Sequence, residues 1–141
     1  MEDTYNPDLF LLDRLFLKEG CMQVELLKAK IHGIRVTEAN LHYRGSLTVD
    51  ETLMKAAGML EYEKVKVVNN ANGERLWTYL IKGGAGSGVC CLNGAAAFKG
   101  TQGDELIVMA FVRMSNAAAQ VFKPVRVFIG DRNVIDKIEA D

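Results

Sequence analysis

The chain has 141 residues, with 17 basic and 18 acidic side chains and a formal net charge of −1. Its 49% hydrophobic and 25% charged residues are ordinary for a globular domain, which excludes a disordered chain. The near-neutral charge argues against nucleic acid as a partner. No apolar run reaches the roughly 18 residues of a membrane span. The length is that of one domain with a single hydrophobic core.

Residues 1–21 differ from the rest and are predicted to be an N-terminal extension that forms a short amphipathic helix. Asn6 and Pro7 form a typical helix start, and Gly20 is placed to end the helix. The segment carries acidic residues where a signal peptide carries basic ones, so we expect a cytoplasmic protein. Leu9, Leu12 and Phe16 form the apolar stripe of this helix.

From residue 22 onward the pattern is mostly that of short strands. Asp50 and Gly58 are placed to start and end one short helix, and Asn72-Gly73 is typical of a hairpin with a two-residue turn. Frequent strands and turns in one domain predict a small closed β-barrel, because closure removes exposed sheet edges. The expected strands are 22–37, 64–67, 74–82, 89–92, 106–112, 121–129 and 134–138, with a glycine-rich turn at 83–88.

The three cysteines do not suggest a disulfide framework or a metal site. Cys90 and Cys91 are adjacent, and the third, Cys21, leaves an odd number. None has metal-ligand spacing to another cysteine or to a histidine, so we expect buried, reduced thiols and no metal.

Several short motifs together carry a family resemblance. His42-Tyr43-Arg44-Gly45-Ser46 follows Lys28-Ala29-Lys30-Ile31-His32, and Asn72-Gly73-Glu74-Arg75 is followed by Thr78-Tyr79. Asn93-Gly94-Ala95-Ala96-Ala97 and Gly103-Asp104 come next in the same order. Over about residues 22–138 the chain resembles the pyruvoyl-dependent aspartate 1-decarboxylases.

The resemblance implies a double-psi β-barrel over 22–141 that assembles as a homotetramer. It also implies a proenzyme that cuts itself between Gly45 and Ser46 into residues 1–45 and 46–141. The Ser46 hydroxyl attacks the Gly45 carbonyl, and the resulting ester eliminates and hydrolyses to leave Ser46 as a covalent pyruvoyl group. Glycine suits this cut because it leaves the carbonyl unshielded. No external cofactor or metal is expected.

The implied reaction is the decarboxylation of L-aspartate to β-alanine and CO2, which supplies pantothenate and coenzyme A biosynthesis. The substrate amine condenses with the pyruvoyl carbonyl as a Schiff base, and the carbonyl acts as an electron sink. The sequence leaves open whether maturation is unaided or needs a partner protein. Arg44 occupies a position where many relatives have an acidic residue, and its effect on the cut is also open.

The resemblance assigns roles to a group of residues on the predicted strand 74–82. Tyr79 matches the family's proton donor, and Thr78 a residue that serves both self-cleavage and substrate binding. Arg75 is the candidate clamp for a substrate carboxylate, since a guanidinium binds carboxylate bidentately. Strand alternation puts Arg75, Trp77 and Tyr79 on one face and turns Thr78 away. A site at a seam between subunits would reconcile the two faces.

Other matched residues lie outside that strand. Gly94, Ala95 and Ala96 match a substrate-binding loop, where small side chains let backbone N–H groups approach a carboxylate and a following short helix would aim its positive end there. Lys30 matches an active-site lysine. His32 is either a structural histidine or a site residue. The alternative to the enzyme is a barrel of the same fold that does not cut itself and acts as a binding or scaffolding module.

Overall fold

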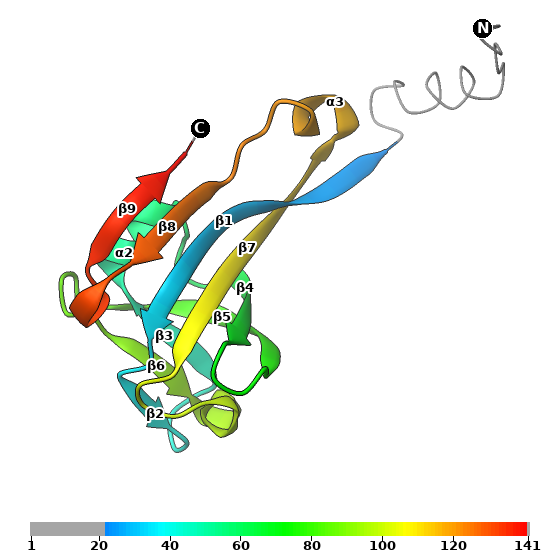
Figure 1. Cartoon of the computed structure of the whole chain (residues 1–141). Helices are drawn as coiled ribbons and strands as arrows, with labels where there is room; N and C mark the ends of the chain where they lie inside the picture. Colours follow the sequence, from blue (N-terminus) through cyan, green and yellow to red (C-terminus); the bar gives the residue numbers. More distant parts are fainter. Residues whose placement is uncertain (1–21, 141) are drawn as a thin grey trace, which may run out of the picture. The chain divides into compact units, whose positions relative to one another are not determined.

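A computed structural model describes residues 22–140 of the chain (Figure 1). The helix predicted in 1–21 lies outside the described residues, so the division into 1–21 and 22–141 stays a prediction. No helix in the described part is long and apolar enough to cross a membrane. The elements are β1 (Gln23–Arg35), β2 (Glu38–Asn40), β3 (Ser46–Asp50), α2 (Glu51–Ala57), β4 (Lys64–Asn69), β5 (Arg75–Gly83), β6 (Cys90–Asn93), η1 (Gly94–Lys99), β7 (Glu105–Ser115), α3 (Asn116–Ala119), β8 (Val125–Ile129), η2 (Asp131–Asn133) and β9 (Ile135–Glu139).

The nine strands form one mixed sheet in the order β2-β6-β3-β5-β4-β7-β1-β8-β9 (Figure 1). Three pairs are parallel, β1 with β8, β2 with β6 and β3 with β5, whereas β3 with β6 and β4 with β5 are antiparallel. The predicted mainly β class with a few short helices is confirmed, and the mixed sheet is consistent with the expected barrel.

The chain divides into two compact units. In the smaller one, the described residues are 22–26 and 112–122. There Arg113 Nε lies 3.3 Å from Glu25 Oε2, and the Ser115 hydroxyl caps α3 by accepting from the Ala118 N–H at 3.1 Å. The larger unit, 27–111 and 123–141, contains every residue of the candidate site.

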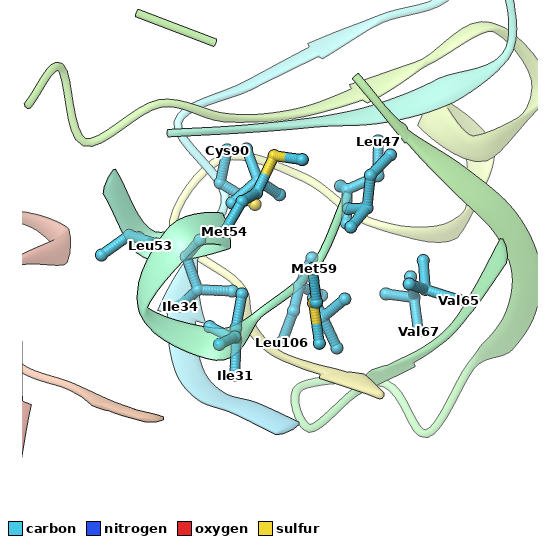
Figure 2. Close-up of a cluster of buried hydrophobic side chains, with 14 of the residues drawn as sticks. Ile31, Ile34, Leu47, Leu53, Met54, Met59, Val65, Val67, Cys90 and Leu106 are labelled. Atoms are coloured by element: carbon cyan, nitrogen blue, oxygen red, sulfur yellow. The ribbon is translucent and has the colours of Figure 1, made fainter. Parts of the chain in front are cut away.

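The core of the larger unit is formed by aliphatic side chains from strands and from α2 (Figure 2). Leu47 on β3 and Val65 on β4 are fully buried, and Met54 contributes from the helix. Full burial of such side chains stabilises a fold by about 1.5–3 kcal/mol each. The side chains labelled in Figure 2 are Ile31, Ile34, Leu47, Leu53, Met54, Met59, Val65, Val67, Cys90 and Leu106.

The helix predicted between Asp50 and Gly58 is confirmed with both caps. The Asp50 carboxylate accepts from the Thr52 N–H at 2.8 Å, and Gly58 ends the helix in the left-handed region at φ +67°.

Two predicted elements differ from the structure. The β4–β5 hairpin has residues 70–74 between its strands instead of a two-residue turn, because the side-chain amides of Asn69 and Asn72 both donate to the Lys99 carbonyl, at 3.0 and 2.9 Å, and hold the loop against η1. The strand expected at 121–129 begins only at Val125, and the preceding segment contains α3, which the sequence did not predict.

Candidate active site

A pocket of about 400 Å³ lies where the start of β3, the middle of β5 and the helix η1 meet. It combines residues from three separate stretches of sequence, and each stretch contains one of the motifs that carry the family resemblance. The lining residues are Gly45, Ser46, Leu76, Trp77, Thr78, Tyr79, Ala95, Ala96 and Lys99.

Ser46 is the first residue of β3, and its side chain is held in place by Asn93. Its relative exposure is 1%, whereas the preceding Gly45 is exposed. The Ser46 hydroxyl accepts from Asn93 Nδ2 at 2.9 Å and lies 3.4 Å from the Arg44 carbonyl, to which it donates. Asn93 sits directly opposite Ser46 in the antiparallel register of β3 and β6. The Gly45–Ser46 peptide bond therefore links an exposed glycine to a buried serine whose hydroxyl is held by hydrogen bonds.

Gly94 brings η1 against the backbone of the Gly45–Ser46 segment. It is buried and has φ +62°, a conformation that favours glycine. A Cβ at this position would lie 2.8 Å from both the N and the Cα of Gly45, and 2.9 Å from the Tyr43 carbonyl oxygen. Only a glycine allows so close an approach of the two backbone segments.

The predicted alternation along β5 is present. Arg75, Trp77 and Tyr79 are exposed, whereas Leu76 and Thr78 are half-buried. Trp77, Thr78 and Tyr79 nevertheless all line the pocket, so both faces of this strand border the same cavity.

An aromatic surface surrounds Tyr79 and Trp77 on the exposed face. The Tyr79 ring lies 6.4 Å from that of Tyr62, centroid to centroid. The Lys64 and Lys66 ammonium groups lie 5.0 and 5.5 Å from the Trp77 ring centroid. Cations held over an aromatic face make this rim of the pocket electropositive.

Besides Gly94, three residues considered from the sequence do not line the pocket. Arg75 is the first residue of β5. It lies on the same face as Tyr79 and two residues before Trp77. Lys30 is on β1, paired with Arg126 of β8. His32, on the same strand, packs its ring 5.6 Å from that of Phe128, and its buried Nδ1 has no hydrogen-bond partner among the described residues. Within this pocket the structure thus brings together Gly45, Ser46, Thr78, Tyr79, Ala95 and Ala96, with Gly94 directly behind them.

Two residues at the site, Asn93 and Lys99, were not predicted from the sequence as site residues. Asn93 was part of a quoted motif, but only the strand register shows that it faces Ser46. Lys99 follows the predicted loop by a few residues, and its Nζ lies 2.7 Å from Glu74 Oε2. For Asn93, the available signal was an asparagine at the end of an apolar strand, because a buried polar side chain needs a hydrogen-bond partner.

A second, smaller cavity of about 200 Å³ lies beside the glycine-rich turn. Asp50 there accepts from the backbone N–H groups of Gly86 and Gly88 at 3.0 and 2.8 Å, besides capping α2. Burial alone raises the pKa of the Asp50 carboxyl, but these backbone donors outweigh burial and hold that pKa below its usual value. Asp50 thus fixes the turn in place.

No group of three or more His, Cys, Asp or Glu side chains able to hold a metal occurs among residues 22–140.

Comparison with known proteins gives one consistent result. A model of the aspartate decarboxylase family matches residues 22–136. An aspartate 1-decarboxylase of Parabacteroides distasonis is 56% identical over 107 residues, which cover 76% of this chain and 92% of that protein. Those of Caldicellulosiruptor saccharolyticus and Clostridium botulinum are 54% and 50% identical over 117 residues, covering 83% of this chain and 91% and 94% of theirs.

Proposed function

The chain belongs to the aspartate decarboxylase family, and we propose that it cuts itself between Gly45 and Ser46 and then decarboxylates L-aspartate to β-alanine and CO2. The observation that carries this proposal is the buried Ser46 hydroxyl, held by Asn93 at the edge of a pocket and next to the exposed Gly45. The β-alanine supplies pantothenate and coenzyme A biosynthesis.

The cut begins with the Ser46 hydroxyl as nucleophile. Its oxygen bonds to the Gly45 carbonyl carbon, the carbon–nitrogen bond breaks, and the hydroxyl proton passes to the freed amine. The ester then loses a proton from the Ser46 Cα to water, and the Cβ–O bond breaks to release the Gly45 carboxylate. Water replaces the nitrogen of the remaining dehydroalanine, and ammonia leaves.

The product is a pyruvoyl group at the start of residues 46–141. The site fits it, because Ser46 lies in the lining of a pocket that admits a small amino acid. The pyruvoyl carbonyl supplies the electron sink for loss of CO2. No metal is required for this chemistry.

The chain's own residues bind the substrate and move the proton. We assign Tyr79 as the proton donor and Thr78 as a substrate contact, since both border the cavity. The small side chains of Ala95 and Ala96 leave backbone groups open to a carboxylate, and Gly94 keeps that loop close to Ser46. Arg75 is proposed to clamp a substrate carboxylate, and the positively charged rim at Trp77 favours such an anion.

The proposal also includes the oligomeric state of the protein. As the family resemblance implies, we infer that the chain forms a homotetramer. Lys30 lies outside the pocket that one chain forms, so we propose that it acts at the site of a second subunit. A cytoplasmic location, and maturation either unaided or with a partner protein, belong to the same proposal.

Intact mass spectrometry of the purified chain tests the cut. We expect fragments 1–45 and 46–141, the second with a blocked N-terminus, and β-alanine formation from aspartate. Ser46→Ala removes the nucleophilic oxygen, so this variant is expected to stay whole and inactive. A wild-type chain that stays whole, with no β-alanine formed, would instead indicate the non-cutting barrel module.

A further inference from the structure

We propose that Cys91 is a positioning residue for the cut: its thiol orients the side-chain amide of Asn93 so that both N–H groups face β3. The inference rests on the proposed self-cleavage, and it concerns how Asn93 is held.

Four polar side chains form a cluster on one face of the β3–β6 pair. Ser46 is opposite Asn93 in the register, and Thr48 is opposite Cys91. Because side chains alternate along a strand, the residues next to these four in the two strands point the other way, into the hydrophobic core. Those core residues are Leu47 and Val49 of β3 and Cys90 and Leu92 of β6, none more than 1% exposed.

The cluster is joined by three hydrogen bonds. Asn93 Nδ2 donates to Ser46 Oγ at 2.9 Å and to Thr48 Oγ1 at 2.8 Å. Cys91 Sγ donates to Asn93 Oδ1 at 3.0 Å. Asn93 is 2% exposed, so the orientation of its amide depends on these neighbours.

The two hydroxyl groups alone do not fix that orientation. A hydroxyl both donates and accepts, so Ser46 and Thr48 would satisfy the amide oxygen as well as the amide nitrogen. A thiol donates to an oxygen but is a weak acceptor. Cys91 therefore distinguishes the two ends of the amide and keeps the oxygen away from Ser46.

The thiol keeps its proton at neutral pH. Burial and the nearby Glu38 carboxylate raise the pKa of Cys91, and together they outweigh a backbone hydrogen bond from Asn40 that lowers it. A thiolate would repel the amide oxygen, whereas the protonated form donates to it.

The orientation matters because negative charge develops on the Ser46 oxygen during the cut. It develops first as the hydroxyl loses its proton, and again as the oxygen leaves with the Gly45 carboxylate. An N–H donor stabilises that charge, and an amide oxygen in its place would destabilise it.

The test compares Cys91→Val with Cys91→Thr, two side chains of nearly equal shape of which only threonine keeps a donor. The fraction of chain cut at Gly45–Ser46 is followed over time by intact mass. We expect C91V to cut about tenfold more slowly, as for loss of one buried hydrogen bond, and C91T to lie between C91V and wild type, because its hydroxyl donates to the amide oxygen but, unlike a thiol, also accepts from the amide nitrogen. Cys90→Ala, which removes the neighbouring core-facing thiol, is the control and is expected to cut at the wild-type rate.

Melting temperatures separate positioning from stability: C91V, which leaves the Asn93 amide oxygen unsatisfied, should melt a few degrees below C91T. Cys90→Ala should also melt below wild type but keep the wild-type cutting rate, so lost stability alone does not slow the cut. Equal slowing of C91V and C91T, or a C91V rate equal to wild type, would overturn the role of Cys91. If C91V does not fold, the same criteria apply to C91A against C91S. A wild-type chain that is never cut would instead overturn the proposed function itself.

Discussion

Replacing Gly94 with alanine tests the close contact between η1 and the segment to be cut. The new Cβ would lie 2.8 Å from the N and Cα of Gly45, whereas ordinary contacts begin near 3.4 Å. The two backbones must therefore separate by about half an ångström. A left-handed alanine costs about 1–2 kcal/mol, and the overlap adds about 1–3 kcal/mol. We expect a loss of about 2–5 kcal/mol in the free energy of unfolding.

The displacement should also slow the cut, because a shift of this size at reacting groups costs about 10- to 100-fold in rate. Gly58→Ala is the matched control: its φ is +67°, close to the +62° of Gly94, but nothing lies within 4 Å of the added Cβ. Urea unfolding of uncut variants, made in the Ser46→Ala background, gives the stability difference, and intact mass gives the cutting rate. Equal stability losses at the two positions, with wild-type cutting in G94A, would refute the reasoning.

Three further changes address other parts of the molecule. Arg75→Ala should still cut but lose about 30- to 1,000-fold in kcat/KM for aspartate, as for loss of a bidentate carboxylate contact, with Lys82→Ala as a control on the same strand; near-native kcat/KM would remove Arg75 from the site. Asp50→Asn should lose about 1–3 kcal/mol at pH 7 in urea unfolding, because an NH2 group replaces one of the two carboxylate oxygens that accept from backbone N–H groups. Since the folded pKa of Asp50 is lowered, its contribution is present above pH ~4 and is lost as the pH falls through the folded pKa, so the stability difference between wild type and variant should shrink as the pH falls below ~4. A chain starting at Met22 should cut and form β-alanine like the full chain; a soluble but uncut product would place residues 1–21 in the active machinery.

The parts of the site that the sequence predicts are those governed by local periodicity. The alternation from Arg75 to Tyr79 depends only on β5 being a strand, and the structure has it. The caps of α2 likewise depend on residues adjacent to the helix. Local rules also placed Thr78 away from Tyr79, although the pocket borders both.

Local rules could not predict that Asn93 is the hydrogen-bond partner of Ser46, because the two residues are 47 positions apart in the chain. Nothing near Asn93 in the sequence indicates that it faces Ser46, and only the register of β3 on β6 establishes it. The open hairpin loop was missed for a similar reason, since Asn69 is held by Lys99 and Asp104, both distant in sequence.

The strand order has a consequence for the life of the cut protein. β6 lies between β2 and β3, and β1 is paired with β8, so β1 and β2, the two strands that the structure describes within 22–45, are hydrogen-bonded to strands of 46–141. If the chain is cut as proposed, the two fragments are therefore expected to stay together without a peptide bond between them. Once denatured, however, they must find each other by diffusion, so recovery becomes a bimolecular reaction that depends on protein concentration. For the mature form, persistence would then depend on slow unfolding and not on the ability to refold.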